Sequence, residues 1–265
     1  MALAPTPTPV RAALIGVTGR MGAALLRAAP AVPRLSVTAA VASPRSPSLG
    51  RDAGELAGVG CLHLRITSDL PRALAEADVA IDFSSATATR ANLAACRAAR
   101  KPLLIGTTGF AAELDGAFAA AAHDIPLLVA ANTSLGVTLL LELVRIAARA
   151  LPLTFDISIL DAHHRSKQDA PSGTALALGA AAREARQAAR DGEPREGDVG
   201  FASVRAGDIV GEHTVLFAGP GEALSLTHRA TDREIFARGA LAAALWLQSQ
   251  PPGRYTMRDL LGQKQ

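Results

Sequence analysis

One stretch of the chain, residues 161–174, gathers most of the side chains that can move protons or bind anions. It reads Asp-Ala-His-His-Arg-Ser-Lys-Gln-Asp-Ala-Pro-Ser-Gly-Thr, with two imidazoles, a guanidinium and an ammonium close together. Its Ser-Gly-Thr end runs into an alanine-rich stretch, residues 175–190, which predicts a helix. The first turn of a helix leaves backbone N–H groups unpaired and partly positive, so it can hold a carboxylate or phosphate. An anion site beside proton donors indicates catalysis.

Three residues of this stretch, His163, His164 and Lys167, are the candidates for proton transfer. An imidazole can donate a proton near neutral pH, and Lys167 beside Arg165 can donate a proton or clamp a carboxylate. Two structural alternatives stay open, a polar histidine pair and a helix face shared by His163 and Lys167. We expect no metal, because adjacent histidines point in different directions and no cysteine or His-Glu-x-x-His pattern accompanies them. The remaining histidines have no comparable neighbourhood.

A second candidate site is the pattern Gly16-x-x-Gly19-x-x-Gly22, which follows an apolar run at residues 10–15. Glycines at a strand-to-helix turn let the backbone approach a pyrophosphate, which then lies on the helix N-terminus. The pattern predicts a bound dinucleotide, and a simple strand-to-helix turn is the alternative. The residues expected to contact the cofactor here are Gly16, Val17, Thr18, Gly19, Arg20 and Met21.

The end of the second predicted strand, residues 35–41, bears on which dinucleotide is used. An acidic residue usually binds the ribose 2′-hydroxyl of NAD at this place. The chain instead reads Ala42-Ser43-Pro44-Arg45, without a carboxylate. Ser43 and Arg45, with Arg20, could meet a 2′-phosphate, so we expect NADPH as the cofactor without excluding NADH. The alternative is that Arg45 is a solvated loop residue.

Two more loops follow predicted strands in the same half of the chain. In an open α/β sheet, ligands bind beyond the carboxyl ends of the strands. Backbone and hydroxyl groups there could face the nicotinamide and its ribose, although spacing alone leaves this open. The residues concerned are Gly106, Thr107, Thr108, Ala130, Ala131, Asn132 and Thr133.

The pattern of elements predicts two domains. Over residues 1–133, short apolar runs alternate with helical stretches, which indicates βαβ units in a Rossmann-like, doubly wound α/β domain with a parallel sheet. Over residues 134–237, two helices and four strand-like runs with glycine turns predict an α+β domain with an antiparallel or mixed sheet. A C-terminal helix, residues 238–265, is expected to return to the first domain. The predicted strands are residues 10–15, 35–41, 79–83, 103–105, 127–131, 155–160, 200–205, 209–218 and 223–230, and the predicted helices include 21–29, 89–100, 111–122, 135–150, 175–190 and 238–247.

Composition narrows the class of protein. The 265 residues carry a net charge of +3, and one Trp and one Tyr cannot form a base-stacking platform, so we expect no nucleic-acid partner. No apolar run reaches the about 20 residues that span a bilayer, so we expect no membrane partner. Two cysteines form no disulfide framework, and residues 1–9 are interpreted as a disordered leader and not as a signal peptide. We therefore expect a cytoplasmic protein.

These motifs resemble the 4-hydroxy-tetrahydrodipicolinate reductase (dihydrodipicolinate reductase) family over nearly the whole chain after the leader. The most specific shared feature is the signature His-His-x-x-Lys-x-Asp-Ala-Pro-Ser-Gly-Thr, residues 163–174. Other shared segments are residues 16–22, 50–56, 81–84, 106–110, 131–137, 207–215 and 236–241.

The resemblance implies hydride transfer from NAD(P)H to a cyclic imine dicarboxylate, giving tetrahydrodipicolinate in lysine and diaminopimelate biosynthesis. It implies that His163 is the acid/base residue, that Lys167 donates the proton and that His164 binds the substrate. Gly173 and Thr174 would hold a substrate carboxylate. The resemblance also implies a homotetramer built by the sheet of the second domain.

The chain departs from the family pattern in three places. Ala42 stands where an acidic residue is common, Thr133 where an aromatic residue often follows the asparagine, and Ser85-Ala86 where Pro-Glu is frequent. Two other functions remain as alternatives. One is a related Rossmann reductase acting on another small dicarboxylate, and the other is a redox sensor that binds NADPH without turnover. His163 and Lys167 argue against the sensor, which needs no proton donor.

Overall fold

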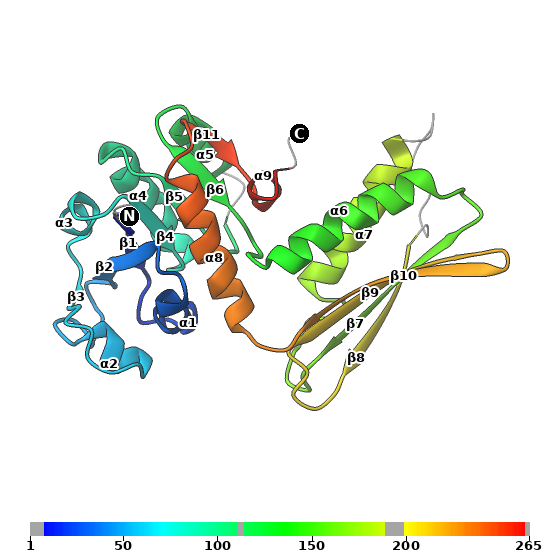
Figure 1. The fold of residues 1–265 in the computed structure, drawn as a ribbon, viewed down its shortest axis with the longest axis horizontal. Coiled ribbons are helices and arrows are strands. Elements are labelled where there is room, and N and C mark those ends of the chain that lie inside the picture. The colour runs from blue at the N-terminus through cyan, green and yellow to red at the C-terminus, as the bar shows by residue number, and fades with distance from the viewer. Residues whose placement is uncertain (1–7, 111–113, 189–198, 263–265) are drawn as a thin grey trace, which may run out of the picture. The chain divides into compact units, whose positions relative to one another are not determined.

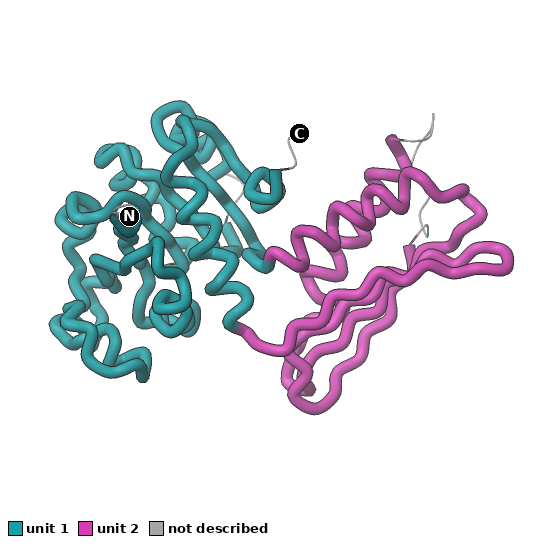
Figure 2. Tube along the Cα trace, viewed as in Figure 1, with its two compact units in different colours: residues 1–134, 234–265 teal, residues 135–233 magenta. Residues whose placement is uncertain are grey.

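The structure is a computed structural model that describes residues 8–110, 114–188 and 199–262 (Figure 1). The chain divides into two compact units, residues 1–134 with 234–265 and residues 135–233 (Figure 2). The predicted leader, residues 1–9, lies outside the described residues except for residues 8 and 9. Residues 111–113 and 189–190 of two predicted helices also lie outside them. None of the helices in the described ranges is long and apolar enough to cross a bilayer.

The first unit is built on a seven-stranded sheet whose paired strands all run parallel, in the order β11–β6–β5–β4–β1–β2–β3. The chain order reverses on either side of β1, and ligands of doubly wound sheets bind beyond the strand ends at such a point. The strands are β1 Val10–Ile15, β2 Leu35–Val41, β3 Ile66–Thr67, β4 Val79–Asp82, β5 Leu103–Ile105, β6 Pro126–Val129 and β11 Gly253–Tyr255. The prediction of a Rossmann-like parallel sheet is confirmed.

Helices cover both faces of this sheet, because alternate residues of each strand point to opposite faces. Leu14 belongs to the core that includes α1 and α8, whereas its neighbour Ile15 belongs to the core that includes α3, α4 and α5. The helices are α1 Arg20–Ala28, α2 Ala53–Ala57, α3 Leu70–Ala75, α4 Ala86–Ala98, α5 Leu114–Ala122, α8 Glu234–Leu247 and α9 Met257–Leu260, with a 3₁₀ turn at Ala29–Ala31.

The glycine turn between β1 and α1 has a steric reason. A Cβ atom added to Gly16 would lie 2.6 Å from the carbonyl oxygen of Phe83, and one added to Gly22 would lie 2.4 Å from that of Val17. Gly16 also has a positive φ of 84°, which L side chains rarely adopt. These glycines therefore let β4 and α1 pack closely against the turn.

The second unit is a mixed four-stranded sheet in the order β10–β9–β7–β8, with β7 and β8 parallel and the other pairs antiparallel. Its strands are β7 Asp156–His163, β8 Val199–Arg205, β9 Gly211–Gly219 and β10 Glu222–Ala230, and its helices are α6 Leu135–Ala150 and α7 Gly173–Ala188. Both helices lie on one face of the sheet (Figure 1). Leu140, Val144 and Leu178 pack there against Ile159 and Phe217.

Several predictions about elements are wrong in detail. Residues 234–237 were expected in the second domain but form the first turn of α8, which belongs to the first unit. Residues 238–265 are not one helix, because the described part of this segment continues after α8 as β11 and α9. The short elements α2, β3 and α3 were not predicted. They contain two to six residues, too few to show a periodic pattern.

Strand β7 runs three residues farther than predicted and includes Asp161 and His163. Hydrogen-bonded neighbours hold these residues in the sheet, because β8 pairs with β7 up to His163 and β9 pairs with it up to Ala162. The alternation of the strand places Ile157, Ile159, Asp161 and His163 on the buried face.

Candidate active site

The centre of the site is a buried carboxylate beside an imidazole on one face of β7. His163 Nδ1 lies 3.1 Å from the Asp161 carboxylate, and the two residues are 9% and 1% exposed. Both side chains point to the same face because they are two residues apart on a strand. Asp161 can thus accept a hydrogen bond from the His163 ring.

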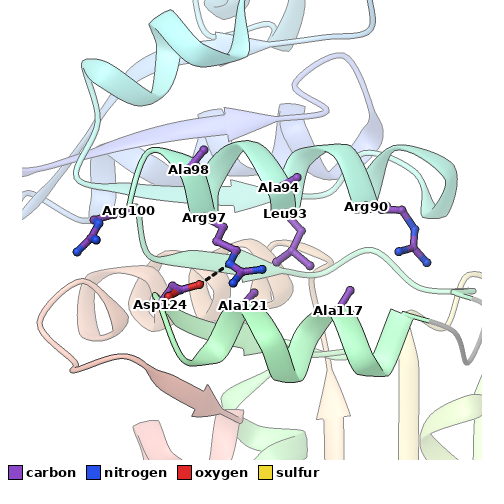
Figure 3. Close-up of a pocket in the computed structure, with 9 residues that line it drawn as sticks. All are labelled: Arg90, Leu93, Ala94, Arg97, Ala98, Arg100, Ala117, Ala121 and Asp124. Carbon is purple, nitrogen blue, oxygen red and sulfur yellow. Dashed lines mark hydrogen bonds and ion pairs between the residues drawn. The ribbon is translucent and has the colours of Figure 1, made fainter.

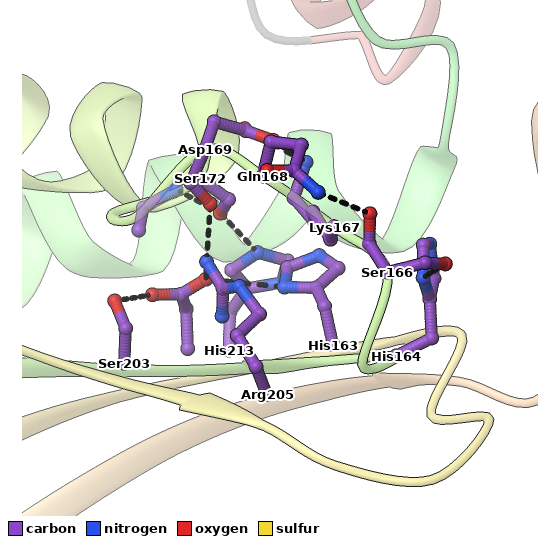
Figure 4. A network of polar contacts seen from close by, with 12 residues as sticks. His163, His164, Ser166, Lys167, Gln168, Asp169, Ser172, Ser203, Arg205 and His213 are labelled. Carbon is purple, nitrogen blue, oxygen red and sulfur yellow. Dashed lines mark hydrogen bonds and ion pairs between the residues drawn. The ribbon is translucent and has the colours of Figure 1, made fainter.

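The neighbouring strand β8 supplies two more donors to Asp161. In the parallel register, Ser203 lies beside Asp161 and Arg205 beside His163. The Ser203 hydroxyl donates to Asp161 over 2.5 Å, and Arg205 Nη2 lies 3.0 Å from the carboxylate (Figure 4). Burial alone would raise the pKa of Asp161, but the Ser203 hydrogen bond and the Arg205 charge outweigh it and hold the pKa below its usual value. The carboxylate is therefore ionised at neutral pH.

His163 is held in its neutral form. Burial lowers the pKa of His163 first, and the positive charge of Lys167 lowers it further, against the opposing effect of Asp161. With Nδ1 directed at a carboxylate, the network assigns the proton to Nδ1. Nε2 makes no hydrogen bond among the described residues, so it is the ring nitrogen left for a ligand.

Strand β9 adds a second imidazole, His213. Its ring meets that of His163 edge to face, with centroids 5.1 Å apart at 71°. Its Nε2 lies 3.1 Å from the Ser172 hydroxyl. Burial, followed by the charge of His163, lowers the pKa of His213 to about 4. The statement that the histidines outside the 161–174 stretch have no comparable neighbourhood is thus wrong for His213.

Ser172 connects this cluster to the start of α7. Its hydroxyl accepts a hydrogen bond from the Ala175 backbone N–H over 3.2 Å, so it caps the helix. Gly173 follows it, exposed, and a Cβ atom there would meet nothing within 4 Å. The helix dipole and the open space above Gly173 make this end of α7 suitable for a carboxylate. Thr174, the other residue predicted to bind a carboxylate, is the second residue of the same helix.

Lys167 and Arg205 are joined through Asp169. The Lys167 ammonium lies 2.7 Å from the Asp169 carboxylate, and this bond is the main reason that the pKa of Asp169 is lowered. Arg205 Nη2 donates to the Asp169 carbonyl over 2.5 Å (Figure 4). Arg205 therefore contacts both the carboxylate that holds His163 and the residue that holds Lys167.

The structure does not place His164 with this cluster. Its Nδ1 lies 2.8 Å from the Ser166 hydroxyl, and the two side chains lie apart from the rings of His163 and His213 (Figure 4). The reason is that His164 follows the last residue of β7, after which the chain turns. Its predicted role in substrate binding stays a prediction.

Three of these groups could also be considered as metal ligands. One ligand atom each of Asp161, His163 and His213 lies within 4.8 Å of the others. The Asp161 oxygens already accept from Ser203, Arg205 and His163, so the cluster is satisfied as a hydrogen-bond network. The spacing of these three groups does not test whether the protein binds a metal ion, so the absence of a metal site stays a prediction.

The first unit carries a hollow of about 570 Å³ beside the glycine turn. Gly16, Thr18, Gly19 and Ser43, four of the residues predicted to contact the cofactor, line it. Helix α1 begins there without a side-chain cap and without an acidic residue in its first turn, so its backbone N–H groups suit a phosphate. The remaining lining residues are Ile15, Val41, Ala42, Pro44, Ser68, Leu70, Phe83, Ser84, Ser85, Thr87, Ala88, Ala91 and Asn92.

Other predicted cofactor contacts lie outside the lining of this hollow. Val17 is buried in the core, Met21 packs against the core, and the Arg20 and Arg45 residues are exposed. The loop residues Gly106, Thr107 and Thr108 follow β5, and Ala130, Ala131, Asn132 and Thr133 follow β6, at the same carboxyl edge of the sheet.

Sequence reasoning missed a polar group at the end of β4 that shapes this hollow. Asp82 is fully buried, and Asn92 donates to both Asp82 and the Ser84 hydroxyl over 3.0 Å. Burial raises the pKa of Asp82 despite these bonds. The segment shared with the family at residues 81–84, in which Phe83 and Ser84 follow Asp82, is the sequence signal that could have indicated this group.

Another hollow, of about 480 Å³, lies between α4 and α5 (Figure 3). It contains none of the predicted site residues. Its polar lining comes from arginines of α4 and the following turn, and Arg97 is paired there with Asp124. Alanines make up much of the rest of its surface.

Comparison with known proteins gives consistent matches along the chain. Residues 10–133 match the family model "Dihydrodipicolinate reductase, N-terminus" and residues 136–261 match "Dihydrodipicolinate reductase, C-terminus". A 4-hydroxy-tetrahydrodipicolinate reductase of Alkalilimnicola ehrlichii is 50% identical over 263 residues, which cover 95% of this chain and 98% of that protein. The enzyme of the same name from Methylococcus capsulatus is 47% identical, over 96% of this chain and 99% of that protein.

Solved structures agree in fold. A dipicolinate-bound dihydrodipicolinate reductase from Paenisporosarcina sp. TG-14 has a TM-score of 0.77 at 21% identity, over 94% of this chain and 98% of that chain. An amine dehydrogenase from Mycobacterium smegmatis has a TM-score of 0.60 at 15% identity, over 94% and 95%. At these identities, both matches show a likeness in fold alone.

The lowered pKa of His213 predicts a dependence of stability on pH. The unfolded chain binds a proton to this histidine near pH 6.5, whereas the folded chain does so only near pH 4, so stability falls as pH drops between these values. We expect His213→Gln to remove that loss, which amounts to about 2 kcal/mol between pH 7 and pH 5, because glutamine does not titrate. Calorimetric melting between about pH 7 and pH 5 measures the effect. The exposed His123→Gln is the control, and a wild-type pH slope in His213→Gln would refute the prediction.

Proposed function

The chain belongs to the dihydrodipicolinate reductase family, and we propose from this premise that it reduces 4-hydroxy-tetrahydrodipicolinate, or its dehydrated form dihydrodipicolinate, to tetrahydrodipicolinate. The observation that carries the proposal is the identity of 47% to 50% with two reductases of that name over nearly the full length of both chains. The reaction belongs to the biosynthesis of diaminopimelate and lysine, and it makes the protein an NAD(P)H-dependent oxidoreductase.

The substrate is a dicarboxylate, and the second unit has a place suited to one of its carboxylates. The exposed start of α7, at Gly173 and Thr174, offers the helix dipole and an open approach. Ser172 links this helix end to His213, whose ring contacts His163. A carboxylate at Gly173 would therefore lie near the proton-handling groups. We assign His164 to substrate binding on the family resemblance alone.

Two residues divide the proton chemistry. When bound, the nicotinamide supplies a hydride, and the reduced product then needs one proton. Lys167 is the donor, since an ammonium held by Asp169 carries a proton that can be given up. His163 is the acid/base partner. The lowered pKa of His163 keeps its ring neutral at pH 7, so the lone pair of Nε2 can accept a hydrogen bond or a proton.

The first unit binds a pyridine nucleotide, and we propose NADPH as the preferred one. None of the described residues that line the hollow beside the glycine turn is acidic, so none can bind the two ribose hydroxyls of NADH as a carboxylate does. Ser43 lines the hollow, and its hydroxyl accepts from the Arg45 backbone N–H over 3.3 Å. The exposed Arg45 side chain is free to reach a 2′-phosphate.

We propose a homotetramer assembled through the sheet of the second unit. Helices α6 and α7 cover one face, and the opposite face carries Leu160, 43% exposed, and Val204, 51% exposed. Ala162 pairs with Val204 across the two strands and extends this apolar surface. An exposed apolar sheet face of this kind suits a partner subunit. We also place the enzyme in the cytoplasm, where its free thiols Cys61 and Cys96 would stay reduced.

The first test is turnover. Purified protein should oxidise NADPH when the substrate is made in situ from pyruvate and aspartate semialdehyde by the preceding synthase. Lys167→Met and His163→Gln should each lower kcat about 100-fold or more, because each removes a group that handles the transferred proton. The exposed His123→Gln should behave as wild type. A folded protein that binds NADPH but oxidises none would shift the assignment to a redox sensor or another substrate.

The cofactor preference can be tested separately. Arg45→Ala should lower kcat/KM for NADPH about 10-fold, because a charge-assisted bond to the 2′-phosphate is lost, and leave kcat/KM for NADH unchanged. The NADH value serves as the internal control. If wild-type kcat/KM for NADH exceeds that for NADPH by more than about 10-fold, the prediction that the residues after β2 favour NADPH is wrong.

The assembly can be tested by light scattering after size exclusion. Wild type should elute at four times the chain mass, and Val204→Lys should elute at a smaller mass, because a charge is costly to bury in an apolar interface. Leu153→Lys, a 52% exposed leucine of the turn before β7, is the control and should not change the mass. An unchanged mass for Val204→Lys would place the interface elsewhere.

A further inference from the structure

Asp161 is the most deeply buried acidic group of the second unit's site, and the proposed reaction gives it no direct task. It is 1% exposed, yet three donors from two strands surround it: His163, Ser203 and Arg205. A carboxylate that deep is costly to bury unless such donors compensate for lost water. The cost indicates that the charge serves something other than packing.

The neighbour whose chemistry depends on this charge is His163. A carboxylate at Nδ1 accepts a hydrogen bond from the Nδ1–H group, so the neutral ring keeps its proton on Nδ1 and Nε2 is unprotonated. Ser203 holds one carboxylate oxygen, and Arg205 shares the other with the imidazole. The carboxylate therefore cannot rotate away from His163 without breaking two bonds to β8.

We propose that Asp161, held by Ser203 and Arg205, is a positioning residue that sets the tautomer and the orientation of the His163 imidazole. The inference rests on the proposed reductase function, because only there is Nε2 of His163 required as the reactive nitrogen. Asp161 itself does not touch the substrate.

Gly211 of β9 supports this orientation from another side. A Cβ atom at this position would lie 3.2 Å from Nε2 of His163. A side chain there would crowd the ring at Nε2, so the glycine leaves the space that the imidazole occupies beside Asp161. The register of three strands thus determines where the imidazole points.

The charged and titratable groups that face His163 come from four segments. Asp161 of β7 raises its pKa, whereas Lys167 of the following loop and Arg205 of β8 lower it, and His213 of β9 contacts its ring. Removing the Asp161 charge leaves only positive neighbours. The His163 pKa should then fall further below its already lowered value.

The experiment combines imidazole NMR with kinetics on the full chain. Long-range ¹H–¹⁵N spectra of wild type should show His163 with its proton on Nδ1. Asp161→Asn should shift the proton toward Nε2, because the new amide can donate to Nδ1, and should lower the His163 pKa by about 1 unit or more. Its kcat should fall about 100-fold, with KM changed less than about 3-fold.

A second variant covers the case in which Asp161→Asn does not fold. Ser203→Ala removes one donor to Asp161 and should lower kcat about 3-fold to 10-fold, because the carboxylate is held less firmly. Asp124→Asn is the matched control, since its carboxylate also pairs with an arginine but is exposed (Figure 3). It should change neither the His163 spectrum nor kcat.

Two outcomes would overturn the proposal. One is a wild-type His163 that carries its proton on Nε2. The other is an unchanged tautomer, pKa and kcat in the folded variants. If wild type does not reduce the dicarboxylate at all, the proposed function fails, but the spectra of wild type and Asp161→Asn still decide whether Asp161 sets the state of His163.

Discussion

The parallel pairing of β7 with β8 is the constraint on which the substrate half of this protein depends. Its register places Ser203 beside Asp161 and Arg205 beside His163. A slip of one residue would turn both β8 side chains to the opposite face and leave a buried carboxylate without its donors. Such a group costs several kcal/mol, so the hydrogen-bond network and the strand register stabilise one another.

In the first unit, the candidate cofactor site is shaped by the backbone at the glycine turn and less by side chains. Its glycine turn brings β1, β4 and α1 together more closely than any side chain would permit at Gly16 or Gly22. The same geometry leaves the N–H groups at the start of α1 without an acidic neighbour. Close packing and a helix start suited to an anion therefore follow from the same residues, which is why the glycine pattern can be recognised in a sequence.

The features that could be predicted from the sequence are those that depend on residues close together in the chain. Strands β1, β2, β4, β5 and β6 and helices α1 and α6 carry their own apolar pattern, and so their bounds are nearly as expected. The glycine turn and the motif at residues 161–174 are local in sequence and were recognised. His163 and Lys167 were singled out for the same reason, four residues apart in one segment.

The partners of Asp161 and His163 lie far away in the sequence, and no local pattern predicts them. Ser203 and Arg205 lie on β8, about forty residues beyond Asp161, and His213 lies on β9. Their roles exist only once the strands have paired. The same holds for Asn92, which meets Asp82 across β4 and α4. The extension of β7 was missed because its last residues are polar, and polar strand residues are stable only when such partners are present.

Electrostatics supports the separate roles that we propose for His163 and Lys167. An imidazole and an ammonium close together cannot both be positively charged without cost, and burial places that cost on His163. Lys167 keeps its charge beside Asp169, at a more exposed position than His163. Asp161 opposes the lowering of the His163 pKa, so that the ring remains basic enough to exchange a proton. The lowered pKa of His163 thus leaves a neutral imidazole beside a charged side chain, which is the arrangement that the proposed division of proton transfer requires.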